Sequence, residues 1–277
     1  MSTKLRSWIS KLRSWASQSA LLSKVIYRFD RIFFRKNSYS SGGEDLIISG
    51  ILNRYKLLTG EDYKLSYLDI GAFEPVRSSN TYFLYRMGSR GSIVEPNPYL
   101  VNLWKSSRPG DNLISAACGT GKKAALLIFG ANAESNTTSE SFAKGITAQQ
   151  RVEVSKQIEV DVYSLDELIS LHRERFNHEF LIDLDVEGLD YEVLVNCDFL
   201  AGKPTILLVE DFHRDEATGV SEIHELVTKK GFCLYGRSIN TAIYLDRHST
   251  LFKTFSKDLD MSGEKIEMKS TAFSDRA

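Results

Sequence analysis

Leu68-Asp69-Ile70-Gly71-Ala72 is the stretch that decides the fold of this chain, and Ile182-Asp183-Leu184-Asp185-Val186-Glu187-Gly188 repeats its pattern further along. Both read as buried strands that end in carboxylates and a glycine. In an open α/β sheet, ligands bind at the carboxyl ends of the parallel strands, so polar side chains at those ends meet a ligand. The two stretches therefore predict an α/β fold with a ligand site, and an enzyme is the leading interpretation.

Strand-like runs alternate with helical stretches through most of the chain. A polar linker, 38–43, precedes a predicted helix, 44–58. The predicted strands span 65–70, 91–95, 112–117, 124–129, 158–162, 180–185, 205–210, 232–236 and 241–245. This alternation predicts a doubly wound, mostly parallel sheet. The short polar turn between the last two strands predicts that they pair antiparallel.

The chain divides into three segments. They are a basic amphipathic helical segment, 1–36, one catalytic domain, 37–250, and a polar C-terminal tail, 251–277. A length of 277 residues with 42% hydrophobic content is ample for one large core. Residues 130–150 are rich in Asn, Ser, Thr and Gly, so we expect a mobile loop there over the site.

The net charge of −1 is unevenly spread. Residues 1–36 hold nine Lys or Arg against Asp30 alone, so the remaining body is net acidic. An acidic body argues against general nucleic-acid binding, which needs basic side chains along a phosphate track. Cys118, Cys197 and Cys233 are odd in number and far apart, so they read as reduced core residues of a cytoplasmic protein.

The head of the chain carries a seven-residue repeat. Lys4-Leu-Arg-Ser-Trp-Ile-Ser10 is followed by Lys11-Leu-Arg-Ser-Trp-Ala-Ser17, which places Leu and Trp on one helical face. Such a basic amphipathic helix suits an anionic membrane surface, or equally packing on the body of the chain or on a second copy of it. Since no apolar run is long enough to span a bilayer, we expect a cytoplasmic protein able to lie peripherally at the inner membrane face.

The first strand end has features of a nucleotide site. Asp69 and Gly71 open a tight turn, where glycine lets the backbone approach a ligand. Glu95 ends the next strand, where a carboxylate is placed to accept both ribose hydroxyls of a nucleoside. The small residues of 115–119 then leave room for a flat ring such as adenine.

Acidic side chains also gather after a later strand. Asp183, Asp185 and Glu187 alternate, so they point to one side if the strand continues that far. Three like charges on one face need a cation, a basic partner or a proton between them. Asp183 lies deeper in the strand and reads as structural, whereas the other two are candidates for the site.

The following strand ends in Glu210, Asp211 and His213 at the same edge. Oxygen ligands from neighbouring strand ends suit a hard divalent cation such as Mg²⁺, and the predicted ligands are Asp185, Glu210 and Asp211. His213 suits a general base near neutral pH, so the predicted catalytic residues are His213, Asp185 and Glu210. The other histidines lack acidic partners of similar spacing and read as surface residues: His172, His178, His224 and His248.

Six blocks, taken together, resemble the FkbM family of S-adenosylmethionine-dependent methyltransferases. They are YLDIGA (67–72), IVEPNP (93–98), SAAC (115–118), VYSLDEL (162–168), LIDLDVEGLDYEVL (181–194) and ILLVE (206–210). The resemblance covers residues 44 to about 245 and implies a class I methyltransferase, Rossmann-like fold, with which the predicted antiparallel ending agrees. The departure is Glu74-Pro75, which stand where glycine is usual, although Pro followed by Ser-Asn-Thr is similar to one branch of the family.

The resemblance implies S-adenosylmethionine as the cofactor. Asp69 and Gly71 would hold its methionine end and Glu95 its ribose, with Asp185 beside the transferring methyl group. The implied cofactor-binding residues are Asp69, Gly71, Ala72, Ser79, Asn80, Glu95, Pro96, Asn97, Ala117, Cys118, Asp185 and Glu187.

We therefore expect O-methyl transfer to a sugar hydroxyl in polysaccharide or glycolipid biosynthesis. The alternatives are a methyltransferase of a small natural product or lipid headgroup, and a non-catalytic nucleotide-binding or membrane adaptor protein. The combination of Asp69, Glu95, Asp185 and His213 favours an enzyme over a binding module. An NAD-dependent dehydrogenase is disfavoured because no Gly-x-Gly-x-x-Gly follows the first strand.

Overall fold

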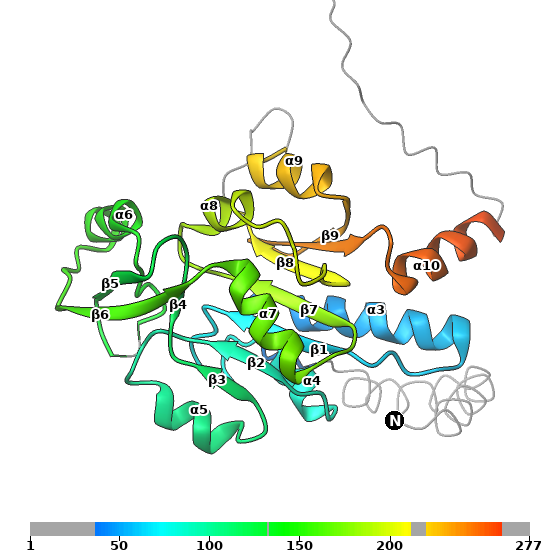
Figure 1. Cartoon of the computed structure of the whole chain (residues 1–277), viewed down its shortest axis with the longest axis horizontal. Coiled ribbons are helices and arrows are strands. Elements are labelled where there is room, and N and C mark those ends of the chain that lie inside the picture. The colour runs from blue at the N-terminus through cyan, green and yellow to red at the C-terminus, as the bar shows by residue number, and fades with distance from the viewer. Residues whose placement is uncertain (1–36, 132, 212–219, 262–277) are drawn as a thin grey trace, which may run out of the picture. The chain divides into compact units, whose positions relative to one another are not determined.

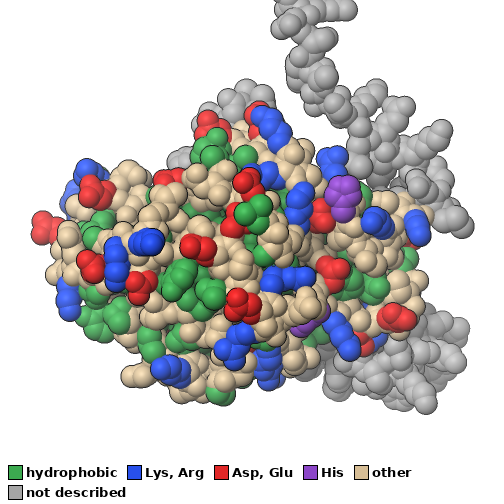
Figure 2. Space-filling model, viewed as in Figure 1, with side chains coloured by type: hydrophobic (Ala, Val, Ile, Leu, Met, Phe, Trp, Pro, Cys, Tyr) green, Lys and Arg blue, Asp and Glu red, His purple; other side chains and the backbone are tan. Residues whose placement is uncertain are grey.

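The computed structural model of the chain describes residues 37–131, 133–211 and 220–261. The basic head, 1–36, lies outside these residues, so the amphipathic helix expected there stays a prediction. None of the described helices combines the length and the apolar character needed to cross a bilayer. Over the face seen in Figure 2, described acidic and basic side chains are interspersed, and this face presents no extended basic surface.

A seven-stranded sheet forms the centre of the fold (Figure 1). In spatial order its strands are β3 (Asn112–Ile114), β2 (Gly91–Val94), β1 (Ser66–Ile70), β7 (Phe180–Leu184), β8 (Ile206–Glu210), β10 (Thr241–Asp246) and β9 (Phe232–Arg237). The first five run parallel, whereas β10 pairs antiparallel with both β8 and β9. The predicted doubly wound sheet with an antiparallel C-terminal hairpin is confirmed.

Helices cover both faces of this sheet because alternate strand residues are apolar on each side. Leu68 and Ile70 of β1 share one core with α7 (Leu165–Arg175), α8 (Asp190–Val195) and α9 (Glu222–Lys229). Tyr67 shares the opposite core with α3 (Glu44–Thr59), α4 (Tyr82–Arg86), α5 (Val101–Ser107) and α10 (Thr250–Met261). The result is a three-layer sandwich in which β1, β2, β7 and β8 are buried almost throughout, whereas the edge strand β3 is half-buried.

The part of the chain between β3 and β7 forms a second sheet of three strands. It consists of β4 (Ala117–Cys118), β6 (Lys156–Tyr163) and β5 (Lys123–Ile128). The strand expected over 112–117 is thus two strands in two sheets. The strands expected over 124–129 and 158–162 form, but they pair antiparallel with each other outside the main sheet.

Two segments contain more helix than the sequence indicates. The expected loop over 130–150 ends in α6 (Glu140–Gln150), because the Ser139 hydroxyl accepts a hydrogen bond from the Phe142 N–H and caps the helix. The polar tail expected from 251 begins with α10, whose Leu251 and Phe255 are buried in the core.

His172 is buried inside the fold, and its prediction as a surface residue is wrong. Its Nε2 lies 3.1 Å from the Ser66 hydroxyl and its Nδ1 lies 3.1 Å from the Ser92 hydroxyl. The ring therefore joins α7 to β1 and β2 as a neutral hydrogen-bonding group. Burial lowers the pKa of His172 to about 3.

His172→Gln tests this role through the pH dependence of stability. At pH 7.5 we expect a loss of about 1–3 kcal/mol in the free energy of unfolding, since two buried hydrogen bonds are disturbed. Below about pH 6.5 the unfolded wild type binds a proton that the folded ring excludes, so wild-type stability falls towards pH 3.

The difference in free energy of unfolding between wild type and variant should therefore shrink by up to about 2 kcal/mol between pH 6.5 and pH 5. Urea unfolding followed by circular dichroism measures this difference. His178→Gln, at an exposed histidine, is the matched control. A gap that stays constant with pH would contradict the buried neutral ring.

Candidate functional site

The site lies where the strand order reverses. From β1 the chain moves outward to β2 and β3, and it then returns to β7 on the other side of β1. Such a switch point opens a crevice at the carboxyl ends of the two central strands. Asp69 and Asp183 are direct neighbours across β1 and β7 at this point.

Two adjoining pockets occupy this crevice, which we call the inner and the outer pocket. The walls that they share are formed by Gly71, Phe73, Glu134, Asp185 and Glu187. The inner pocket has a cavity volume of about 50 Å³ and the outer pocket about 350 Å³, so the outer pocket has the volume typical of a small-molecule site. All twelve predicted cofactor-binding residues line one pocket or both: Asp69, Gly71, Ala72, Ser79, Asn80, Glu95, Pro96, Asn97, Ala117, Cys118, Asp185 and Glu187.

Glu95 organises the inner pocket. Its Oε2 accepts a hydrogen bond of 2.8 Å from the Phe73 N–H, and its Oε1 accepts one of 2.7 Å from the Asn97 N–H. Burial raises the pKa of Glu95 to about 7, and these two hydrogen bonds oppose the rise. Each oxygen keeps a further lone pair, so the carboxylate can still accept ligand hydroxyls. Ala117 and Cys118, two small side chains, line the same pocket.

Three carboxylates, which we call the carboxylate trio, meet where the pockets adjoin: two belong to the shared wall and Glu210 lines the outer pocket. Asp185, Glu187 and Glu210 bring one oxygen each within 4.8 Å of one another. Burial is the main cause that raises the pKa of Asp185 to about 6, that of Glu187 to about 8 and that of Glu210 to about 10. Repulsion from the charge of Asp185 is the second cause for the other two.

The trio differs from the predicted metal-ligand set. Asp211 does not join it, because its Oδ2 accepts a hydrogen bond of 2.9 Å from the Ser221 hydroxyl and pairs with Arg237 at 2.5 Å. Glu187 takes its place, since β7 ends at Leu184 and the chain then turns. His213, predicted as a catalytic base, lies outside the described residues.

Two oxygens of the trio have no hydrogen-bond donor among the described residues. They are Asp185 Oδ1 and Glu210 Oε2, and both are buried. A buried carboxylate oxygen without a donor is costly, so it is a place where a ligand proton or a cation is favourable. The trio can therefore accept a proton or hold a positive charge.

Asp69 and Asp183 face the loop that follows β1. The Thr81 hydroxyl donates to Asp69 Oδ2, and Asn80 Nδ2 donates to Asp183 Oδ1 at 3.2 Å. Burial raises the pKa of Asp69 to about 6 and holds that of Asp183 well above its ordinary value. Asp183 is thus buried and bonded within the fold, as its prediction as a structural residue implied.

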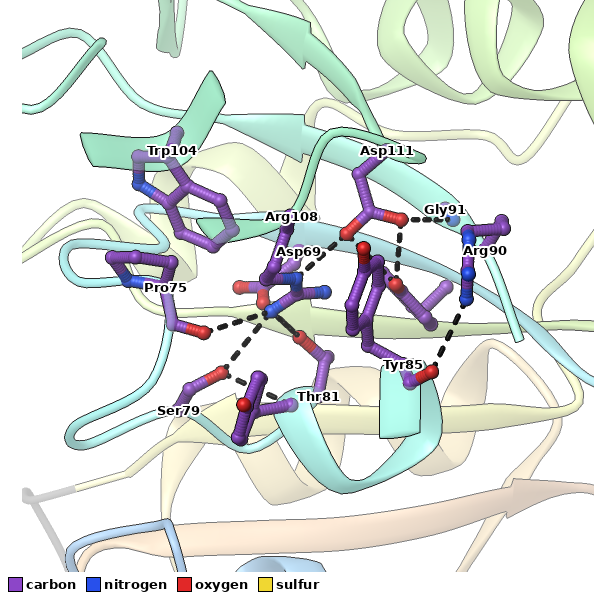
Figure 3. Close-up of polar contacts among 12 residues, drawn as sticks. Asp69, Pro75, Ser79, Thr81, Tyr85, Arg90, Gly91, Trp104, Arg108 and Asp111 are labelled. Carbon is purple, nitrogen blue, oxygen red and sulfur yellow. Dashed lines mark hydrogen bonds and ion pairs between the residues drawn. The ribbon is translucent and has the colours of Figure 1, made fainter. Parts of the chain in front are cut away.

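The loop 72–81 lacks the usual glycines, and buried side chains hold it instead (Figure 3). Arg108 lies beneath it, and its Nη1 donates to the Thr81 hydroxyl at 3.1 Å and to Ser79 Oγ at 3.4 Å. Trp104 Nε1 donates to the Phe73 carbonyl at 2.7 Å. These contacts stabilise a backbone in which two residues other than glycine adopt left-handed conformations: Phe73, with a φ of 46°, and Ser78, with a φ of 57°.

Arg108 itself is held by a buried ion pair. Its Nε donates to Asp111 Oδ2 at 2.7 Å, and both side chains are almost fully buried. Asp111 also accepts hydrogen bonds from the Tyr67 hydroxyl, at 2.6 Å, and from the Gly91 N–H, at 3.0 Å. One ion pair therefore connects β1, β2 and the loop 72–81.

Several residues of the site were missed from the sequence. Glu44 and Glu134 line the outer pocket, and Arg108 and Asp111 support its loop. Charged residues in polar stretches usually lie in solvent, so nothing in their local sequence marks these four as buried or as facing a pocket. The local signal was Arg108 and Asp111 on either side of Pro-Gly, and this pattern indicates a turn at least as well as it indicates a buried ion pair.

Gly71→Ala tests the close approach of the two central strand ends. Gly71 has a φ of 75°, and an added Cβ would lie 1.6 Å from the Asp185 carbonyl oxygen. Gly60 has a φ of 79°, yet an added Cβ there meets nothing within 4 Å. We expect Gly60→Ala to cost about 1–2 kcal/mol, and Gly71→Ala to cost several times more because Asp185 must move. Urea unfolding of both variants measures this, and equal losses would refute the steric argument.

Arg108→Met tests the buried ion pair. We expect a loss of about 3–5 kcal/mol in the free energy of unfolding, because Asp111 is left buried without its cation. Arg77→Met is the matched control, since Arg77 pairs with Glu74 on the surface and should cost less than about 1 kcal/mol. Thermal and urea unfolding give both values, and similar losses in the two variants would contradict the role of Arg108.

Comparison with known proteins agrees with this geometry. Searches of curated proteins and of solved structures find no match. The family model described as the methyltransferase FkbM domain matches residues 69–234, from Asp69 at the end of β1 into β9. The matched region contains both predicted strand ends, Glu95 and the whole carboxylate trio. The chain therefore belongs to the FkbM methyltransferase family.

Proposed function

We propose that this methyltransferase uses S-adenosylmethionine and transfers the methyl group to a hydroxyl oxygen of a saccharide. The observation that carries the proposal is the carboxylate trio at the wall between the two pockets. A nucleoside site on one side and proton-accepting oxygens on the other are what O-methyl transfer requires. Saccharide is the acceptor class that the family resemblance favours.

The residues of the inner pocket fit the proposed cofactor. Glu95 would accept the ribose hydroxyls, and Ala117 and Cys118 would lie against the adenine. Gly71 and the loop after it would hold the methionine end, where Ser79 and Asn80 line the outer pocket. S-adenosylmethionine, when bound, supplies a methyl group whose carbon–sulfur bond breaks, with the electron pair left on sulfur, as the carbon–oxygen bond forms.

The trio supplies the proton chemistry in this proposal. A sugar hydroxyl must lose its proton as its oxygen is methylated, and a carboxylate beside it can accept that proton. Asp185 is the favoured base, because its pKa of about 6 leaves it ionised at neutral pH, whereas Glu210, with a pKa of about 10, holds a proton. Positioning of the hydroxyl against the methyl group accounts for much of the remaining barrier.

Three further parts of the proposal stay predictions. A divalent cation, if it is needed, would bind Asp185, Glu187 and Glu210, whose oxygens are close enough for shared ligation. His213 would serve as an additional base. The basic head, 1–36, would hold the enzyme at an anionic membrane face, where lipid-linked saccharides are accessible.

Isothermal titration of the full chain with S-adenosylmethionine, and separately with NAD, tests the cofactor assignment. We expect micromolar affinity for S-adenosylmethionine and none for NAD. Glu95→Gln should weaken that affinity at least tenfold, because a charged acceptor for the ribose hydroxyls is lost. Glu192→Gln, on the exposed side of α8, is the matched control.

Thermal unfolding of each variant shows that the fold is intact. Absence of S-adenosylmethionine binding to folded protein would reject the proposed cofactor and move support to the adaptor alternative. Binding of NAD would instead point to a dehydrogenase.

A further inference from the structure

We infer that residues 133–138 form a flap that must lift before the nucleoside of the cofactor can enter the inner pocket, and that Glu134 latches this flap to the loop 72–81. The inference rests on the proposed function, and it adds to it the route by which the cofactor enters and leaves. Three features carry it: the size of the inner pocket, the way in which the flap is fixed, and the exposure of its latch.

The inner pocket is too small for a nucleoside while the flap lies against it. Its cavity volume of about 50 Å³ holds only a few water molecules, whereas small-molecule sites commonly measure about 300 Å³ or more. The rest of its lining includes Glu95 and residues 116–118, which are buried in the fold and fixed there. The flap is therefore the wall that can move. Five of its residues form this wall: Ala133, Glu134, Asn136, Thr137 and Thr138.

The base of the flap is fixed by hydrogen bonds to β5 and to the turn after β7. The Leu127 N–H donates to the Thr137 carbonyl at 2.8 Å, and the Thr137 N–H donates back to the Leu127 carbonyl at 3.3 Å. Asn136 closes the turn that follows β5, since its Oδ1 accepts a hydrogen bond of 3.0 Å from the Phe129 N–H. The Thr137 hydroxyl also donates to the Glu187 carbonyl at 3.0 Å. This end of the flap therefore stays in place when the other end moves.

Glu134 connects the tip of the flap to the loop 72–81. Its Oε1 accepts a hydrogen bond of 3.2 Å from the Ser78 hydroxyl and lies 3.5 Å from Arg77 Nη1. The side chains of Arg77 and Glu134 are 62% and 55% exposed, so water screens this ion pair and it contributes little to stability. The loop 72–81, in contrast, is held from beneath by the buried Arg108. A weak latch thus joins a movable tip to a rigid loop, which allows the flap to open and close readily.

The latch controls the exchange of the cofactor because entry and exit need the same movement. Lifting the tip opens the inner pocket, and closing it encloses the nucleoside, which excludes water from the contacts of Glu95. The base meanwhile stays bonded to the turn that carries Asp185 and Glu187, so the carboxylate trio keeps its place. The demethylated product leaves by the same opening. The strength of the latch therefore sets how fast the cofactor binds and how fast it or its product is released.

A reversible cross-link between the tip and the loop tests whether the flap must open. Ser78→Cys and Glu134→Cys are combined in the full chain and joined by a short bis-thiosulfonate reagent that a reducing agent removes. Mass spectrometry confirms the bridge, and surface plasmon resonance measures the rates at which S-adenosylmethionine binds and leaves. We expect association to slow by roughly thirtyfold or more in the cross-linked protein and to recover on reduction. Wild type treated with the same reagent is the control, since it keeps the half-buried Cys233.

Arg77→Gln tests the latch from outside the site, because Arg77 is not among the described residues that line the two pockets. We expect the association and dissociation rates both to rise about twofold to fivefold, as the loss of an exposed ion pair allows. The dissociation constant should change less than about twofold, because a weaker latch eases opening of the free and of the bound protein alike. Lys144→Gln, which breaks an exposed pair with Glu140 on α6, is the matched control and should leave both rates unchanged.

Failure of the flap and failure of the proposed function give different results. Cross-linked protein that binds S-adenosylmethionine as fast as reduced protein, or wild-type rates in Arg77→Gln, would overturn the flap while binding itself upheld the proposed function. Faster dissociation of Arg77→Gln at an unchanged association rate would also overturn it, because Arg77 would then act on the bound cofactor. If the double variant fails to bind before cross-linking, the rates of Arg77→Gln decide. If folded wild type does not bind S-adenosylmethionine, the proposed function fails and the inference fails with it.

Discussion

The buried ion pair between Arg108 and Asp111 is the constraint on which the site depends. A guanidinium enclosed by protein is stable only when its charge is paired and its N–H groups are bonded, so its position is fixed by several partners at once. Those partners include the loop 72–81, which the pair holds from beneath (Figure 3). The chain thereby shapes its first ligand loop with a buried cation where a glycine-rich sequence would rely on backbone freedom.

The acidic residues at the same sheet edge work against folding. Burial raises the pKa of Asp69, Glu95, Asp185 and Glu187 to between about 6 and 8. The folded protein then keeps protons that the unfolded chain releases, so stability falls as pH rises from about 4 to 8. A fold retains such a cost where the groups serve a ligand, and hydroxyl donors or a positive charge would relieve it.

The proposed function assigns a different part of the reaction to each pocket. Away from the shared wall, the inner pocket combines the Glu95 carboxylate with small side chains such as Ala117 and Cys118, which suits a nucleoside. The outer pocket is acidic on nearly every side and meets the inner one at the carboxylate trio. Because Asp185 and Glu187 line both pockets and Glu210 lines the outer one, the proposed acceptor hydroxyl would lie beside groups able to receive its proton.

The sequence by itself determined the strands, the antiparallel hairpin and the residues at the strand ends. Hydrophobic runs, turns and glycines are local signals, and the carboxyl ends of parallel strands meet at one edge whatever the loops do. Glu95 and Asp185, which line the inner pocket, were predicted as site residues in this way. The tertiary structure alone decided which charged groups become partners: Glu187 joins the trio, and Asp211 pairs with Arg237.

The burial of His172 and Arg108 belongs to the same class of outcomes. A single sequence shows that a residue is polar, but its protonation and its partners depend on atoms brought close by distant parts of the chain. Ser66 and Ser92 come from two different strands to meet His172, and Thr81 and Ser79 come from a loop to meet Arg108. Local patterns therefore fix where the site lies, whereas long-range packing fixes its charges, because electrostatic energies depend on distance and burial and not on sequence separation.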